Sequence, residues 1–325
     1  MLALTKVKKE IEFNQDFRSL IEVLKSMAVA QFHVLEKKLW LYQEFDQVLD
    51  EFFQSLDLKT LQHRFLVSGT GDSPGVVVAV TSDQGLLGGL NLRVVTTAMG
   101  FLQTAPGEID FEGKASEATP IGEENAAGGI NLQIVNKAVH SMRSERDELV
   151  VVGERGQIYA RERRIPFTSF PGIQDEKQEE QVKTLQHYLF KRLMEGHSGA
   201  LRIVHPQSLS LVNQRIEEIP ILPYSKPLKE GKPSLAGDLS EVLLESSRGK
   251  MLEYLTFVLI GHKLKQVFSL SRIAELGARY LHLEESSQRI QEMNQKLKLR
   301  YFRLRHEIID QSIRELFSAR SLYAG

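Results

Sequence analysis

The sequence predicts an α/β protein in which the two ends of the chain form an antiparallel two-helix coiled coil beside a central doubly wound (Rossmann-like) α/β domain. Two observations support this fold class. All ten prolines lie between Pro74 and Pro233, and proline is the residue that most disfavours a helix interior. The middle of the chain alternates short β-branched runs with helical patterns, as mostly parallel sheets do.

The N-terminal segment contains neither proline nor glycine before Gly69. Its apolar positions are spaced alternately by three and four residues, which indicates a coiled-coil seam. We therefore expect one helix of about 55 residues, on the order of 80 Å long, in a first domain at residues 1–62. The seam consists of Ile21, Leu24, Ala28, Gln31, Leu35, Lys38, Tyr42, Phe45, Leu49 and Phe52.

The central domain is expected at residues 63–248, with an acidic, glycine-rich insert at residues 106–131. Its first buried strand is Val76–Val80, followed by a glycine-rich turn, Thr81–Asn91, and a helix. Further strands are predicted at Leu149–Val152 and Ala200–Val204, the latter after a helix at Gln181–Met194. The segment Ser210–Leu222 is typical of an edge strand, because it contains and is followed by proline.

The C-terminal domain, residues 249–325, is expected to supply the other half of the coiled coil. No proline or glycine occurs between Ala278 and Tyr323. Polar seam members weaken packing but fix the register of the two helices. The seam consists of Leu276, Tyr280, Leu283, Ser287, Ile290, Asn294, Leu297, Tyr301, Leu304, Ile308 and Gln311.

Composition excludes several classes of function. The chain has no cysteine, so it has no disulfide, thiolate metal site or cysteine nucleophile. A net charge of −1 argues against binding nucleic acid over the whole chain. Apolar runs such as Val76–Val80 are far shorter than the roughly 20 residues of a membrane span. No metal-ligand spacing or catalytic constellation occurs, so we expect no enzyme activity, cofactor or metal.

The glycine-rich turn allows two interpretations. Backbone amides at a helix start can bind phosphate, but the spacing G-x-x-G-G is neither a dinucleotide fingerprint nor a Walker A loop. The favoured interpretation is a tight turn in which the glycines let strand and helix pack closely, with Asp83 capping backbone amides.

Residues Thr81–Asn91, TSDQGLLGGLN, resemble the motif T-S-D-[RK]-G-L-C-G-G-[LF]-N of the F-type ATP synthase gamma subunit. Other matches follow in the same order along nearly the whole chain. Lys25-Ser26-Met27 is similar to K-A-M on the first helix of that family. The remaining matches are Glu275 with Ala278-Arg279, Tyr301, Arg305, Ile309, Gln311 and Glu315, Leu211-Val212-Asn213, and Ile219–Pro223.

The chain also departs from the family pattern. Gln84 replaces a basic residue, Leu87 replaces the cysteine, and residues 305–312 differ from the usual terminal block. These departures favour a divergent branch, such as the alternative, sodium-linked F-type ATPases.

The resemblance implies a non-catalytic rotor shaft that couples ATP turnover to proton or sodium transport. Its partners would be the alpha, beta and epsilon subunits and the c-ring, on the cytoplasmic face of the cell membrane, with membrane association through partners only. Lys25, Met27 and Arg279 would lie on the shaft near beta, and Ser82, Asp83, Gly85, Gly88 and Gly89 would shape the turn. The C-terminal contacts would be Arg303, Arg305, His306, Asp310 and Gln311.

Two alternatives stay open at the level of sequence. One is a nucleotide-binding α/β enzyme with helical dimerisation arms, which saturable binding of a dinucleotide would support. The other is a non-rotary coiled-coil scaffold, which a stable homodimer through the terminal helices would support.

Overall fold

The computed structural model of the protein describes residues 2–55, 63, 65–66, 75–102, 147–195, 199–224 and 247–323. The chain divides into two compact units. We call Met1–Ala30 with Arg279–Gly325 the terminal-helix unit, and Gln31–Ala278 the sheet unit. The predicted insert at 106–131 lies outside the described residues. The predicted domain boundaries at 62/63 and 248/249 stay predictions.

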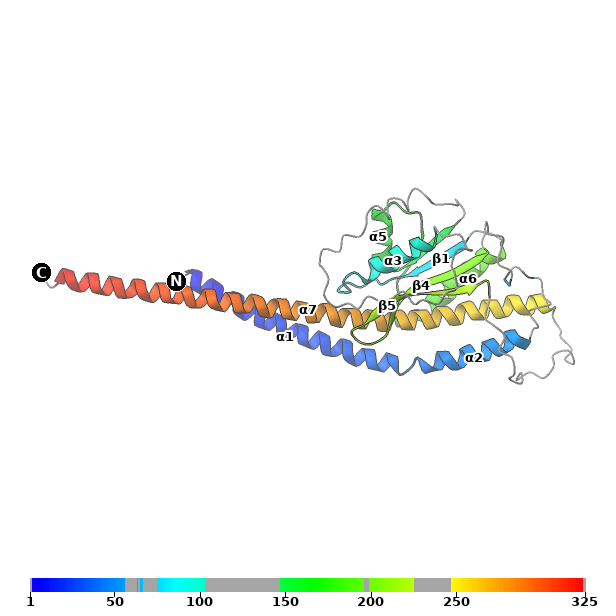
Figure 1. Ribbon diagram of the computed structural model, residues 1–325, viewed down its shortest axis with the longest axis horizontal. Coiled ribbons are helices and arrows are strands. Elements are labelled where there is room, and N and C mark those ends of the chain that lie inside the picture. The colour runs from blue at the N-terminus through cyan, green and yellow to red at the C-terminus, as the bar shows by residue number, and fades with distance from the viewer. Residues whose placement is uncertain are drawn as a thin grey trace, which may run out of the picture. The chain divides into compact units, whose positions relative to one another are not determined.

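Five strands form the sheet, in the order β3-β2-β1-β4-β5. Figure 1 labels β1, β4 and β5. Neighbouring strands are parallel except β4 and β5, which pair antiparallel. The predictions of a mostly parallel sheet and of an edge strand at Ser210–Leu222 are therefore confirmed. The antiparallel direction of that strand and the short β3 were not predicted. The strands are β1 (Gly75–Val80), β2 (Glu148–Val152), β3 (Thr168–Phe170), β4 (Ala200–Ser208) and β5 (Gln214–Leu222).

Helices cover both faces of the sheet. Val76, Val78 and Val80 of β1 pack in one apolar cluster with α6 (Gln178–Met194), α2 (Trp40–Ser55) and the first part of α7 (Arg248–Tyr323). Val77 and Ala79 pack in a second cluster with α3 (Leu90–Phe101) and α5 (Glu154–Glu162). Burial on both faces explains why β1 is a continuous apolar run, and it confirms the doubly wound arrangement.

The N-terminal segment is two helices, α1 (Leu2–Glu36) and α2, so the prediction of one uninterrupted helix is wrong. Hydrogen bonds spaced by three residues, from the N–H groups of Lys38 and Leu39, tighten the chain between them. Leu49 follows Phe32 by 17 residues. At about 100° per residue, its side chain would point about 100° away from that of Phe32 if the helix were regular. A 3₁₀ turn rotates the chain by about 120° per residue, so three such residues reduce that angle by about 60°. Both side chains are buried as a result.

The C-terminal segment is a single helix of 76 residues, α7. Two of the three glycines in its sheet-unit part, Gly261 and Gly277, lie where side-chain amides approach the helix closely. A Cβ atom at Gly261 would lie 2.5 Å from Nε2 of Gln186, and one at Gly277 would lie 2.5 Å from Nε2 of Gln214. Glycine at these positions is therefore explained by packing and does not end the helix.

The predicted seams have different outcomes. On α7, Leu276, Leu283, Ser287, Ile290 and Asn294 are buried, as predicted. On α1 and α2, the predicted members Leu24, Phe45 and Phe52 are 36%, 43% and 52% exposed, and these assignments are wrong. The strict alternation of three and four drifts off the buried face of a helix with 3.6 residues per turn. Lys25 and Phe53, one residue later, take the inward positions.

Candidate functional site

The terminal-helix unit is held together by a narrow apolar seam. Ile21 of α1 packs with Leu283 and Ile290 of α7, and all three are buried. Ala28 is also buried, at 2% exposure, and its small side chain permits close packing. Ile21, Lys25 and Ala28 follow one another at spacings of four and three, so Lys25 is placed on the buried face of α1.

Lys25 forms a polar cluster with three neighbouring residues, Glu22, Glu284 and Ser287. We call these four residues the seam clasp. The Lys25 ammonium forms an ion pair with Glu284 of α7 and lies 3.0 Å from Glu22 Oε2. Ser287 Oγ of α7 donates a hydrogen bond of 3.0 Å to Glu22 Oε1. The clasp, Glu22, Lys25, Glu284 and Ser287, therefore joins the two helices through both carboxylates.

The electrostatics of the clasp favour its charged form. The hydrogen bond to Glu284 raises the pKa of Lys25, and the same contact lowers the pKa of Glu284. Hydrogen bonds from Lys25 and then Ser287 lower the pKa of Glu22. Opposite charges stabilise each other in this way when they share hydrogen bonds, so all three groups carry their charge at neutral pH.

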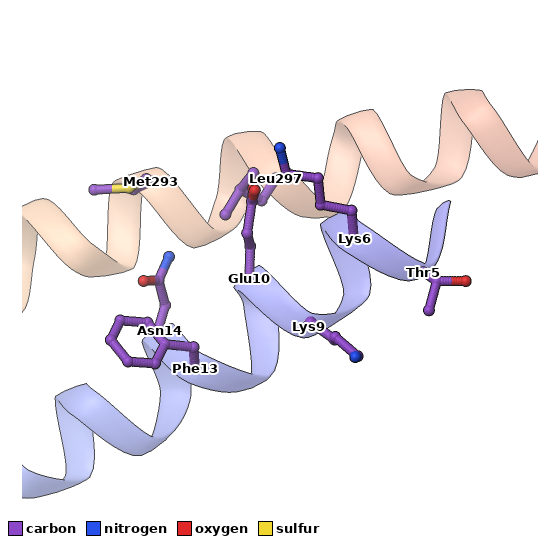
Figure 2. A pocket seen from close by; sticks show the side chains of 8 residues that line it. All are labelled: Thr5, Lys6, Lys9, Glu10, Phe13, Asn14, Met293 and Leu297. Atoms are coloured by element: carbon purple, nitrogen blue, oxygen red, sulfur yellow. The ribbon is translucent and has the colours of Figure 1, made fainter. Parts of the chain in front are cut away.

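A hollow of about 710 Å³ lies between α1 and α7 towards the start of α1. Figure 2 shows Lys6, Glu10 and Asn14 of α1 directed towards α7, which contributes Met293 and Leu297. Phe13, on the same wall, is 67% exposed. The hollow therefore combines apolar side chains with flanking charges, as protein-binding surfaces do. The sequence does not predict this hollow, since helical spacing does not reveal gaps between helices.

The later part of α7 presents two further surfaces. The basic group, Lys296, Lys298, Arg300, Arg303 and Arg305, is exposed, and no described carboxylate pairs with it. The apolar tip comprises Ile309, Ile313, Leu316 and Phe317, which are 43–71% exposed. The spacing of four and three from Ile309 to Leu316 places apolar side chains on one face of the helix. Such a face requires a partner to bury it.

The glycine-rich turn of the sheet unit is ordered by hydrogen bonds from its polar residues. Oδ1 of Asp83 accepts bonds from the backbone N–H groups of Glu154 (2.7 Å) and Gly172 (3.1 Å). The Ser82 N–H donates to Asn91 Oδ1 at 3.1 Å. Asp83 thus caps the first turn of α5, and the prediction that it caps backbone amides is confirmed.

The prediction that the glycines of this turn let strand and helix pack closely is wrong. Cβ atoms at Gly88 and Gly89 would meet nothing within 4 Å, so no close packing requires glycine there. Gly88 has a φ of +55°, which glycine adopts without strain. The close approaches occur opposite the turn, where Cβ atoms at Gly153, Gly156 and Gly172 would lie 2.2–2.3 Å from atoms of Thr81 or Asp83.

The predicted contact residues lie in three separate settings. Ser82, Asp83, Gly85, Gly88 and Gly89 are together in the turn, whereas Arg303, Arg305, His306, Asp310 and Gln311 are all exposed on α7. Met27 is 53% exposed on α1. Arg279 precedes Tyr280, whose ring centre lies 5.7 Å from the Lys25 ammonium. The functional roles of these residues stay predictions. The clasp partners Glu22, Glu284 and Ser287 were not predicted as site residues.

Among the described residues, no cluster of histidine, aspartate and glutamate is arranged to hold a metal ion. None of the described helices is both long enough and apolar enough to cross a membrane.

Comparison with known proteins identifies the family. A family described as ATP synthase matches residues 122–321, more than half of the chain. An ATP synthase gamma chain of Anaeromyxobacter sp. is 21% identical over 323 residues, covering 98% of each chain. One from Clostridium beijerinckii is 24% identical over 226 residues, covering 66% of this chain and 77% of the relative. The chain belongs to the ATP synthase gamma-chain family.

Solved structures support the gamma-chain fold. A chain of the Euglena gracilis mitochondrial ATP synthase has a TM-score of 0.59 at 13% identity and covers 98% of this chain and 94% of its own length. A chain of the Tetrahymena thermophila ATP synthase central stalk has a TM-score of 0.52 at 13% identity, covering 82% and 99%. The gamma chain is a peripheral, non-catalytic subunit of the ATP synthase complex, which decides against the nucleotide-binding enzyme.

Proposed function

We propose that this gamma chain is the central rotor shaft of a rotary F-type ATP synthase, which couples ATP turnover to proton or sodium transport through a membrane ring. The exposed surface of α7 beyond residue 295 supports the proposal most directly. It joins the basic group to the apolar tip on one helix, and both need partners. A shaft inside a ring of subunits would bury such a surface without using it for chemistry.

We assign the alpha and beta subunits to the terminal helices. Acidic loops of beta would meet Arg303 and Arg305, and His306, Asp310 and Gln311 would make further polar contacts. Met27 and Arg279 would contact beta at a lower level of the shaft. Each orientation of the shaft would then favour a different set of beta conformations, because a ligand shifts an equilibrium by its differential contacts with the states.

We assign the epsilon subunit and the c-ring to the sheet unit, which places the chain at the cytoplasmic face of the cell membrane through its partners. In the glycine-rich turn, the carboxylate of Asp83 already accepts the α5 and Gly172 amides. This arrangement supports a structural role for Ser82, Asp83, Gly85, Gly88 and Gly89 and argues against phosphate binding by those two amides.

Charge reversal tests the assignment. The pair Arg303→Glu and Arg305→Glu should lower ATP-driven ion transport by the assembled complex while the purified chain keeps its free energy of unfolding, because both side chains are exposed. Arg289→Glu, an exposed arginine earlier on α7, is the matched control. Unchanged transport in the double variant would remove the electrostatic part of the proposal, and ATP hydrolysis by the purified chain alone would contradict the whole.

A further inference from the structure

The apolar seam of the terminal-helix unit does not define its own register. Leu276, Leu283, Ile290 and Leu297 recur on α7 every seven residues. A shift of α1 by one such repeat, about 10 Å along the axis, would present Ile21 with an equivalent set of apolar partners. A repeating seam of this kind permits slippage unless a polar residue specifies the pairing.

Lys25 supplies that specification within the terminal-helix unit, in addition to the packing of Phe32 of α1 with Ile273 and Leu276 of α7 in the sheet unit. It lies between two residues that are each 2% exposed, Ile21 and Ala28, and its own side chain is only 13% exposed. A cation in such a position requires a carboxylate from the facing helix, and Glu284 provides one. The residues seven positions to either side of Glu284 are Gly277 and Gln291, and neither carries a charge. A slip by one repeat would therefore separate Lys25 from Glu284 and leave no carboxylate at the equivalent position.

We propose that Lys25 is a positioning residue, which locks the register of α1 against α7 through Glu284 rather than contacting a partner subunit. The consequence for coupling rests on the proposed rotary function, whereas the contacts of Lys25 do not depend on it. Glu22 completes the lock, because it binds both Lys25 and Ser287 of α7. With Lys25 turned inward, Met27 and Phe17 are held outward, at 53% and 43% exposure, where partner subunits can reach them.

Register is measured directly by the distance between two spin labels. The chain contains no cysteine, so labels are placed at Ser19→Cys on α1 and Arg289→Cys on α7, both exposed. The parent chain should give one narrow distance distribution. Lys25→Gln should add a second population at a longer distance, because the two labels lie at nearly the same level of the antiparallel helices and any displacement along the axis moves them apart. The exchange of Lys25→Glu with Glu284→Lys should restore the single population. Lys8→Gln, an exposed lysine of α1, is the matched control.

Coupling is measured on the same variants in the complete complex, assembled with alpha, beta and the membrane ring. Lys25→Gln should lose ion transport per ATP hydrolysed, and the charge exchange should recover it. An unchanged distance distribution in Lys25→Gln, or a charge exchange that restores neither quantity, overturns the inference. If the parent complex does not couple at all, the proposed function fails, whereas the distances measured on the purified chain still decide the register lock.

Discussion

The carboxylate of Asp83 accepts a hydrogen bond of 3.1 Å from the backbone N–H of Gly172, 89 residues later in the chain. A Cβ atom at Gly172 would lie 2.2 Å from Oδ1 of Asp83, the atom that also accepts the Glu154 N–H. Three segments of the sheet unit, the glycine-rich turn, the start of α5 and the chain after β3, therefore meet at one side chain.

Gly172→Ala should destabilise the protein by about 1–3 kcal/mol, the usual cost of forcing extra atoms into a packed site. Asp83 cannot move away without losing two hydrogen bonds. Urea unfolding of the purified chain measures the effect. Gly89→Ala is the matched control, because a Cβ atom there meets open space, and it should change the free energy by less than about 0.5 kcal/mol. Equal effects of the two substitutions would refute this account of the turn.

Asp46 of α2 should make stability depend on acid pH. Burial alone would raise the pKa of Asp46, but hydrogen bonds from His262 and Lys263 of α7 lower it from 3.8 to about 2. A lowered carboxyl pKa stabilises the fold above the unfolded value and loses that contribution as pH falls through the folded value. Asp46→Asn should therefore cost about 2 kcal/mol at pH 7.

The cost of Asp46→Asn should shrink as the pH falls from about 4 towards about 2, where the native carboxylate takes up its proton. Unfolding curves of both proteins across this range provide the measurement. Asp16→Asn, an exposed acid on α1, should show no such dependence. A cost for Asp46→Asn that is the same at every pH would exclude the ionic explanation.

His205 of β4 should make the stability of the fold depend on pH in a range closer to neutrality. Burial lowers its pKa below 6.5, and its Nε2 has no hydrogen-bond partner, while Nδ1 contacts the Pro206 carbonyl at 3.0 Å. The unfolded chain therefore binds this proton first as pH falls, so stability should decrease below about pH 6.5. The nearest charged groups, Glu217 and Arg215, have opposing effects on the pKa of His205.

The chain has nine histidines, so His205 has to be replaced on its own to separate its contribution from those of the others. His205→Gln should flatten the slope of unfolding free energy against pH between about 7 and 5 relative to the parent. His306→Gln, an exposed histidine of α7, is the matched control. A parent slope that His205→Gln does not alter would show that this histidine is not the group responsible.

The apolar tip should be needed for assembly and not for stability. Ile313→Asp with Leu316→Asp changes only side chains that are 45% and 71% exposed, so the purified chain should keep its free energy of unfolding within about 0.5 kcal/mol. Co-purification with alpha and beta should weaken, because charges would replace the apolar surface that a partner buries. Full co-purification of the double variant would exclude the tip as a contact.

Local signals in the sequence predicted much of the fold. Val76–Val80 was recognisable because a strand buried on both faces needs consecutive β-branched residues, and Asp83 was recognisable because short carboxylates cap exposed amides. The break after Glu36 was not recognisable, since no proline or glycine marks it. The position of the break depends on which side chains reach the buried face of the helix, and the packing of the whole unit determines that face.

The candidate site was predicted less completely for the same reason. The exposed residues of α7 follow from helical spacing alone. The place of Lys25 in the seam depends on Glu284, a partner 259 positions later on another helix, and Gly172 depends on Asp83 across the sheet unit. Such pairs are set by tertiary contacts that neither spacing nor composition encodes.

Rotation is the most direct test of the central claim. A reporter attached through Leu209→Cys, an exposed site between β4 and β5, would be observed in a complex whose alpha and beta subunits are fixed to a surface. We predict that ATP drives repeated rotation of the reporter in one direction. ATP hydrolysis by the complex with a stationary reporter would contradict the rotor-shaft account.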